Sequence, residues 1–199
     1  MNIFDPLDQN IKKDVKIVAA LERISHAFKV LQLREGKDRQ LSPIQIQIMF
    51  FIQFHAAELC TVSHLAREFD LTKATVSDAV RVLLQKGLVE KTMDSTDSRS
   101  YYIKPTVEGQ REINNMKDFG MPVLKSLKGL STDEKNNLLN ALFEIIRHLN
   151  KAGVISVQRI CHNCAFYEKK EGQHFCNLLK SGLADADIRM DCPEFVAGN

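Results

Sequence analysis

Apolar side chains recur every three or four residues in the first part of the chain. Within residues 15–32 they stand at Ile17, Val18, Leu21, Ile24, Phe28 and Leu31. This spacing places them on one helical face, so the pattern predicts an amphipathic helix that ends near Gly36. Ser42 and Pro43 then supply an N-cap and a first-turn proline for a second helix that extends to about His55. Because that helix is apolar almost all round, we expect it to be buried.

The periodic segments become shorter after residue 60. One short helix is predicted over residues 61–69 and another over residues 73–86, with Thr72 as the N-cap of the second and Gly87 just beyond its end. Only Asp70–Leu71 separates them. Two short helices joined by so brief a turn form a helix-turn-helix.

Strand-like runs follow at residues 88–91 and 100–104. The polar segment 92–99 lies between them, so this part of the chain predicts a β-hairpin, or wing. Thr106 is then the expected cap of a helix that runs to about Phe119, where Gly120-Met-Pro122 perturbs it.

A last long helix is predicted to begin after Ser131. Ser131 and Glu134 have the spacing of a capping box. The apolar side chains that follow share one face, at Leu138, Leu139, Leu142, Ile145, Ile146 and Leu149. The helix is expected to end at Ala152–Gly153.

Composition adds few constraints. The chain has 199 residues, 44% of them hydrophobic and 26% charged, which is typical of a globular protein. No apolar run reaches the roughly 18 residues that a membrane span needs. The segment MNIFDPLDQNIKK has no apolar core of a signal peptide, so we expect a cytoplasmic protein. The net charge of +2 is too small to indicate nucleic-acid binding by itself.

A helix-turn-helix followed directly by a hairpin is the order of elements in a winged helix. In such a fold the second short helix enters the major groove of DNA, and the wing reaches the minor groove or a phosphate. The polar, outward positions of that helix are candidate DNA contacts: Thr72, Lys73, Thr75, Ser77, Asp78 and Arg81. Arg99 is the candidate minor-groove probe at the wing tip, and Asp97 could orient its guanidinium. For Thr72 the alternative is a capping role only, and for Thr75 and Ser77 it is simple solvation.

Several motifs, in this order, resemble the MarR family of bacterial transcriptional regulators. They are Leu41–Gln45, Thr61–Ala66, Leu71–Ser77, Leu84–Val89, Asp97–Arg99 and Thr106–Gly109. The resemblance covers roughly residues 12–152, and the linked motifs are jointly specific although each is weak alone. Two positions depart from the family pattern: Ser98 stands where many members have a second wing arginine, and Pro105 stands where leucine is usual.

The resemblance implies a mainly α-helical fold with a small β-hairpin wing, and a regulator rather than an enzyme. It also implies a homodimer built from N- and C-terminal helices, a palindromic operator in double-stranded DNA, and a candidate pocket for a small-molecule effector. Repression is the favoured direction of regulation. The expected regions are an N-terminal dimerisation helix (1–40), the winged helix-turn-helix (41–105), C-terminal dimerisation helices (106–153) and a cysteine-rich module (154–199).

Cysteine usage is the anomaly of this sequence. Four of the five cysteines fall in the last 39 residues, at Cys161, Cys164, Cys176 and Cys192. A Cys-x-x-Cys pair lets two thiolates bind one metal from a tight turn, and two more cysteines complete a four-coordinate site. Zinc is the predicted metal, and an iron–sulfur cluster is the alternative because the last two cysteines are widely spaced and Cys192 precedes a proline. His162 and His174 are expected to be bystanders, and Cys60 a small buried residue.

The role of this module stays open between two readings, with a structural role favoured over redox or metal sensing. Two other classes of function compete with the regulator. In one, Cys161 and Cys164 are the dithiol of a redox enzyme, although no βαβ context accompanies them. In the other, the helix-turn-helix has lost DNA binding and serves protein interaction.

The wing assignment predicts that Arg99→Ala weakens operator binding, because the substitution removes a cation from the minor-groove contact. Fluorescence anisotropy with labelled DNA, repeated at several salt concentrations, measures the effect. Unchanged affinity at moderate salt would count against the wing assignment.

Overall fold

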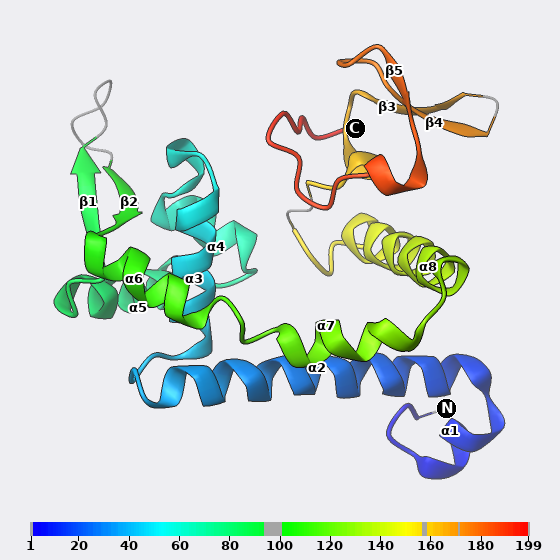
Figure 1. Ribbon diagram of the computed structural model, residues 1–199, viewed down its shortest axis with the longest axis horizontal. Coiled ribbons are helices and arrows are strands. Elements are labelled where there is room, and N and C mark those ends of the chain that lie inside the picture. The colour runs from blue at the N-terminus through cyan, green and yellow to red at the C-terminus, as the bar shows by residue number, and fades with distance from the viewer. Residues whose placement is uncertain (1, 94–100, 157–158, 171, 199) are drawn as a thin grey trace.

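The long helix α2 (Lys13–Lys37) lies along one side of the molecule, with a winged-helix lobe over one end and a C-terminal module above the other (Figure 1). This computed structural model describes residues 2–93, 101–156, 159–170 and 172–198. The remaining α-helices are α1 (Pro6–Ile11), α3 (Pro43–Phe54), α4 (Val62–Glu68), α5 (Lys73–Gln85), α6 (Val107–Met116), α7 (Met121–Ser126) and α8 (Thr132–Lys151). The strands are β1 (Val89–Met93), β2 (Tyr101–Pro105), β3 (Tyr167–Lys170), β4 (Gln173–Cys176) and β5 (Ser181–Leu183).

Helix α3 is the centre of the winged-helix lobe. Its N-terminus has the predicted cap: Ser42 Oγ accepts from the Gln45 amide, and Gln45 Oε1 accepts from the Ser42 amide at 2.8 Å. The side chains of Ile46, Ile48 and Met49 are completely buried. The main core gathers around them and includes residues of α4, α5, α6 and both wing strands. The prediction of a buried second helix is therefore confirmed.

Helices α4 and α5 form the predicted helix-turn-helix. Thr61 Oγ1 caps α4 by accepting from the His64 amide, and Thr72 Oγ1 caps α5. Asp70 adopts a φ of 50°, in the left-handed region that allows the chain to reverse within this short turn. Leu65 of α4 and Leu83 of α5 are fully buried against α3, so the core determines how α5 is held.

The wing begins directly after α5. Strands β1 and β2 are antiparallel, with Val89 opposite Pro105 and Met93 opposite Tyr101. The Ile103 amide donates to the Cys60 carbonyl at 2.8 Å, which joins β2 to the segment before α4. The predicted wing tip lies outside the described residues.

The structure sets the ends of two predicted helices. The N-terminal helix ends near Gly36 as predicted, since the last residue of α2 is Lys37. A Cβ on Gly36 would lie 2.1 Å from the Leu41 carbonyl oxygen, so glycine stands there to allow close packing rather than to end the helix. The helix expected to reach Phe119 ends at Met116, and α7 begins separately at Met121 with a proline in its first turn.

The C-terminal module packs on α8. Helix α8 has the predicted capping box between Ser131 and Glu134. A second, smaller core joins Phe143 of α8 to Ile160 and Ile188 of the module. The module itself contains an antiparallel sheet in the order β3-β4-β5, which the sequence pattern did not predict. The described helices include none that is both long and apolar enough to cross a membrane.

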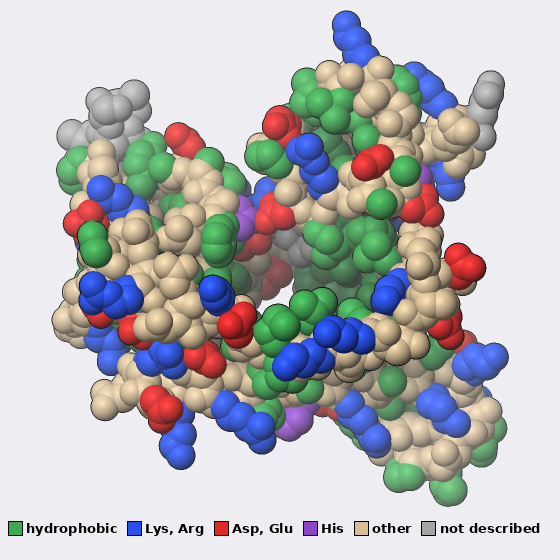
Figure 2. All heavy atoms as spheres, in the orientation of Figure 1, with side chains coloured by type: hydrophobic (Ala, Val, Ile, Leu, Met, Phe, Trp, Pro, Cys, Tyr) green, Lys and Arg blue, Asp and Glu red, His purple; other side chains and the backbone are tan. Residues whose placement is uncertain are grey.

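Helices α2 and α8 carry large apolar side chains that this single chain leaves exposed. They are Ile17, Val18, Ile24, Phe28, Leu33, Leu138, Leu139, Ile145 and Leu149. Figure 2 shows hydrophobic side chains bordering the hollow between the winged-helix lobe and the α8 side of the molecule. Most of the apolar face predicted for α2 therefore points away from this chain's own core.

The close approach of α6 to the end of α5 predicts the effect of a single methyl group. A Cβ on Gly109 would lie 1.9 Å from the Leu88 carbonyl oxygen. We expect Gly109→Ala to cost about 1–3 kcal/mol of folding free energy through overpacking and to lower the melting temperature by several degrees. Gly129→Ala is the matched control, since nothing lies within 4 Å of its added Cβ. Equal melting temperatures for the two variants would contradict this account.

Candidate nucleic-acid interface and cysteine site

The two faces of α5 separate as the sequence predicts. The candidate contacts are all exposed, namely Thr72, Lys73, Thr75, Ser77, Asp78 and Arg81. The opposite face is buried through Val76, Ala79, Val80 and Leu83. Because the buried face packs against α3, the N-terminal half of α5 is presented to solvent on a rigid support. A contact between these side chains and DNA remains a prediction.

Thr72 and Thr75 hydrogen-bond to each other at the start of α5. Thr72 Oγ1 accepts from the Thr75 amide at 3.1 Å, and the two hydroxyl oxygens lie 2.9 Å apart. Of the two roles left open for Thr72, the capping role is observed. The contact between the two hydroxyl groups also orients the Thr75 hydroxyl.

The charged side chains of α5 differ in their partners. Arg81 donates to Asp78 at 2.8 Å, and both side chains are more than half exposed, so this pair adds little to stability. The pair reduces the positive charge that Arg81 presents to a phosphate. Within the described part of the chain, Lys73 forms no salt bridge and remains exposed. Lys73 is therefore the strongest phosphate-binding candidate on this helix.

The described base of the wing carries two cations. Lys91 lies 4.1 Å from the centre of the Tyr101 ring, and Lys104 lies 3.1 Å from Glu90. Asp97 and Arg99, the predicted wing-tip residues, lie outside the described residues.

The four C-terminal cysteines border one small cavity. Cys161 and Cys164 share a 3-10 turn, in which the Cys164 amide donates to the Cys161 carbonyl at 2.9 Å. Cys176 ends β4, and Cys192 lies on the last loop. The cavity has a volume of about 30 Å³, and Phe166, Tyr167, Leu178, Leu183 and Glu194 complete its lining. Three separate segments therefore bring all four thiols to the same place.

The thiols surround this cavity without already forming a closed ligand set. Among the described residues, no three Cys, His, Asp or Glu side chains stand close enough together to hold a metal ion as they are placed. A tetrahedral zinc with Zn–S bonds of about 2.3 Å needs sulfurs roughly 3.8 Å apart. An iron–sulfur cluster accepts wider separations, because its thiolates bind different iron atoms. The predictions of zinc and of an iron–sulfur cluster both remain predictions.

The two nearby histidines do not line the cavity. His174 engages both of its ring nitrogens, with the Tyr167 hydroxyl 2.6 Å from Nδ1 and Asp185 3.3 Å from Nε2. His162 packs between Phe143 and Tyr167, with ring centres 5.5 and 5.0 Å away. That they are bystanders to the four cysteines stays a prediction.

Cys60 is buried in the main core, as its sequence context predicts, with 1% of its surface exposed. Its thiol donates to the Ala56 carbonyl at 3.3 Å. Burial, with a smaller contribution from Glu58, raises the pKa of this thiol to about 11. Cys60 therefore belongs to the main core and not to the cavity lining. Its thiol stays protonated at neutral pH and is a poor nucleophile.

Sequence reasoning missed an ionic network that joins the cysteine module to the helix-turn-helix. Arg159 donates to Glu68 of α4 at 2.8 Å and to Asp191 of the module at 2.5 Å. The other oxygen of Asp191 lies 2.5 Å from His55 Nε2, at the end of α3. His55 is thus part of this network.

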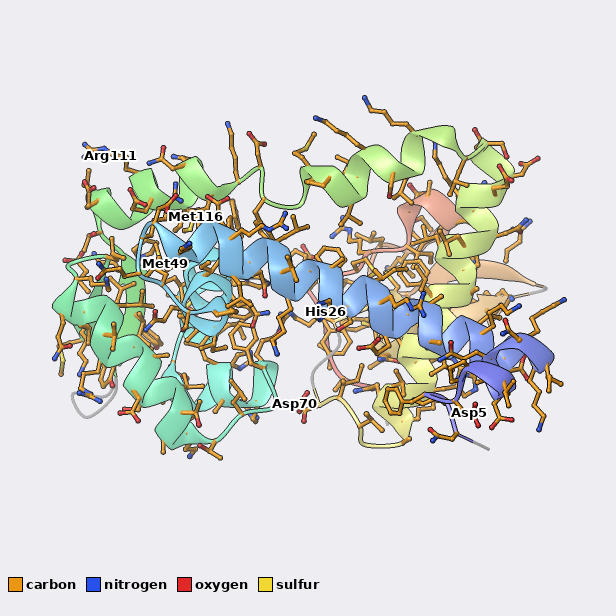
Figure 3. All side chains as sticks on the ribbon, turned by 90° about the horizontal axis from the view of Figure 1, so that it is seen from below. Asp5, His26, Met49, Asp70, Arg111 and Met116 are labelled. Carbon is orange, nitrogen blue, oxygen red and sulfur yellow. The ribbon has the colours of Figure 1, made fainter. Side chains whose placement is uncertain are left out.

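A second connection reaches the turn between α4 and α5. The Ser156 amide donates to Asp70 Oδ2 at 3.1 Å, and the Ser156 hydroxyl donates to the other oxygen of the same carboxylate. Figure 3 shows Asp70 where the helix-turn-helix lies next to the C-terminal part of the chain. These partners are 86 residues apart in the chain, so no local pattern could have indicated the pairing.

Comparison with known proteins finds a similarity in the winged-helix region. Residues 39–100 match the MarR family model. Among solved structures, the DNA complex of Staphylococcus aureus MepR is similar with a TM-score of 0.59 and 21% identity, over 66% of this chain and 97% of that one. The transcriptional regulator SlyA gives a TM-score of 0.60 and 17% identity, over 68% and 95% of the two chains.

A MarR-family regulator from Listeria monocytogenes, complexed with a 26mer DNA, gives a TM-score of 0.56 and 19% identity over 69% of this chain and 91% of that one. No curated protein matches this sequence. The structural likenesses establish the MarR winged-helix fold that the sequence predicted. About a third of this chain lies outside each of these structural alignments.

The environment of Cys60 predicts its reactivity. In the folded protein at pH 8 we expect the four cavity cysteines of metal-free, reduced protein to react with a thiol reagent, while Cys60 stays unmodified, because its pKa of about 11 leaves little thiolate. Mass spectrometry of peptides from alkylated protein measures this difference. Denaturation before alkylation is the control, and it should expose all five thiols. Rapid modification of Cys60 in the folded protein would refute the prediction.

Proposed function

We propose that this protein is a DNA-binding transcription regulator of the MarR type and that α5 is its recognition helix. The single observation that carries the proposal is the exposed polar face at the start of α5, on a winged-helix scaffold whose residues 39–100 match that family. Its width and polarity suit a helix that lies in the major groove. Lys73 binds a phosphate in this proposal, while Thr75 and Ser77 lie within reach of base edges.

The proposed regulator is a homodimer that binds a palindromic operator. The exposed apolar residues on α2 and α8 support this assembly, since a second copy of the chain would remove them from water. Two recognition helices related by a two-fold axis would then read two half-sites of one operator.

The proposal includes control by a small molecule. An open groove of about 420 Å³ lies between α2 and α7 and is lined mainly by apolar side chains, with Arg34 as the charged residue of the lining. A pocket of this size and composition suits a small apolar ligand that carries an anionic group. For the direction of regulation we propose repression, in which a dimer that covers an operator excludes polymerase from it.

The cysteine module is the second part of the proposed regulator. Zinc is the proposed metal and an iron–sulfur cluster the alternative, in a site that stabilises the fold or reports redox state or metal supply. A redox enzyme built on Cys161 and Cys164 is less well supported, because the matched solved structures are regulators and the two thiols face a small apolar cavity. A helix-turn-helix that served only protein interaction is also less well supported, because that role does not require the exposed polar face of α5.

The position of Lys73 predicts a charge-dependent loss of DNA affinity. We expect Lys73→Ala to weaken binding to every DNA sequence and to reduce the slope of log affinity against log salt by about 1, as for the loss of one phosphate contact. Lys128→Ala is the matched control, since Lys128 is exposed in the 3-10 turn after α7, away from α5. The measurement is a gel-shift series against a mixed pool of operator-length duplexes. If the wild-type protein shifts no duplex of the pool in preference to the others, the regulator proposal fails. That result would favour a module for protein interaction.

A further inference from the structure

We infer that the four C-terminal cysteines bind one metal centre through four thiolates, and that this centre holds the helix-turn-helix in place through Arg159. The part that concerns DNA rests on the proposed function. The binding chemistry is that of a thiophilic metal, either a single zinc ion or an iron–sulfur cluster, and the experiments below distinguish the two.

The four thiols converge from separate segments of the chain. Cys161 and Cys164 come from one 3-10 turn, Cys176 from the end of β4 and Cys192 from the last loop, yet all four border the same cavity of about 30 Å³. Apart from Glu194, the rest of the lining is apolar or aromatic. Four sulfurs gathered in such surroundings are the donor set that a thiophilic metal prefers, and they bind it as thiolates.

Backbone groups support the ligands. The Arg189 amide donates to Cys161 Sγ at 3.3 Å, which is the kind of hydrogen bond that stabilises a metal-bound sulfur. The Cys161 amide donates to the Arg189 carbonyl at 3.2 Å, so the two segments are joined reciprocally. The turn that carries the first two cysteines is thereby fastened to the loop that carries the fourth.

The module also lacks a core that could hold it together. Of its described residues, only Arg159, Ile160 and Ile188 are buried, and both isoleucines pack toward Phe143 of α8. A short segment with so few buried apolar side chains needs a covalent or metal cross-link to keep one conformation. Four metal–sulfur bonds would supply that cross-link.

Two ligands adjoin the ionic network that reaches the DNA-binding lobe. Asp191 directly precedes Cys192, and Arg159 lies two residues before Cys161. The Cys192 amide donates to the Arg159 carbonyl at 3.1 Å. A metal bound by Cys161 and Cys192 therefore fixes the relative positions of Arg159 and Asp191.

The Arg159–Glu68 part of the network is sheltered enough to act as a structural link, while the Asp191 side chain is 45% exposed. The Arg159 side chain is 9% exposed and that of Glu68 15% exposed, and the guanidinium lies 5.3 Å from the centre of the Phe51 ring. An ion pair in such surroundings is disrupted at considerable cost, because losing one partner leaves the other charge buried. Asp191 completes the pair from the module side and also contacts His55.

The consequence is a mechanical connection between the metal centre and the recognition helix. Arg159 holds α4 through Glu68, and Ser156 holds the turn before α5 through Asp70. Loss of the metal would release the loop that carries Asp191 and leave α4 without one of its supports. The orientations of α4 and α5 available for DNA binding would then change in population.

The metal centre is tested on the full-length protein purified without oxygen. We expect either one zinc per chain with no visible absorption, or iron and acid-labile sulfide with a visible absorption band. Cys176→Ser should lose that metal, whereas the matched variant Cys60→Ser should keep it, because Cys60 lies in the main core and a serine hydroxyl can still donate to the Ala56 carbonyl. Equal metal contents in these two variants, or no stoichiometric metal in the wild type after supply of zinc or of iron and sulfide, would overturn the site.

The coupling is tested with Arg159→Gln, which leaves all four cysteines in place. Arg147→Gln is the matched control, since Arg147 pairs with Glu144 on its own helix α8. We expect both variants to keep the metal. Amide hydrogen exchange in α4 should become faster by about tenfold in Arg159→Gln alone, as a supporting tertiary contact is lost.

DNA affinity supplies the functional measurement. For the wild type we expect operator affinity to differ by at least about fivefold between metal-loaded and metal-stripped protein, the lower end of typical coupling between sites. The difference should be smaller in Arg159→Gln and unchanged in Arg147→Gln. Equal exchange rates in α4 for the two variants would overturn the coupling even if stripped protein unfolds. Absence of DNA binding in every form would refute the regulator proposal, while metal content and α4 exchange would still decide this inference.

Discussion

The burial of α3 is the constraint on which the winged-helix lobe depends. Its side chains pack against α4, α5, α6 and the wing strands, so the described parts of the lobe share one core. One face of α5 must therefore turn inward at Val76, Val80 and Leu83, and the opposite face becomes available to a partner. The presentation of Lys73 to solvent is a consequence of hydrophobic packing, since it lies opposite the buried face.

Close backbone approaches refine this packing. At Gly36 and Gly109 a main-chain carbonyl comes so near that no side chain fits. The first approach brings the end of α2 against the segment that leads into α3, and the second brings α6 against the residues that follow α5. The first contact joins α2 to the lobe, and the second fixes α6 within it.

The C-terminal module uses a different physical principle. It buries few apolar side chains, and its attachment to α8 is a small cluster around Phe143. Its contact with the winged-helix lobe is polar, through Arg159, Asp191 and Ser156. Polar contacts of this type depend on distance and angle more strongly than apolar packing does. They therefore form only when the module holds Arg159, Asp191 and Ser156 in the right positions. Four converging thiols fit the proposal that metal–sulfur bonds, and not a hydrophobic core, hold the conformation of this module.

Local patterns were sufficient for most of the winged helix. The caps at Ser42, Thr61, Thr72 and Ser131, and the inward face of α5, follow from side-chain periodicity and capping chemistry, which act over three or four residues. The hairpin and the Cys-x-x-Cys pair are also local patterns in the sequence. The role of Gly36 could not be predicted in this way, because a glycine near a helix end looks the same in the sequence whether it ends the helix or allows a neighbouring carbonyl to approach.

The sequence by itself therefore determined the helices, the exposed face of α5 and the identity of the four candidate ligands. Only the tertiary structure decided that those ligands share one cavity and that Arg159 joins their module to α4. The Arg159–Glu68 and His55–Asp191 partners are 91 and 136 residues apart. Side chains so distant in the chain meet because α8 brings the module back beside the lobe. Local periodicity in the sequence cannot indicate such a long-range contact.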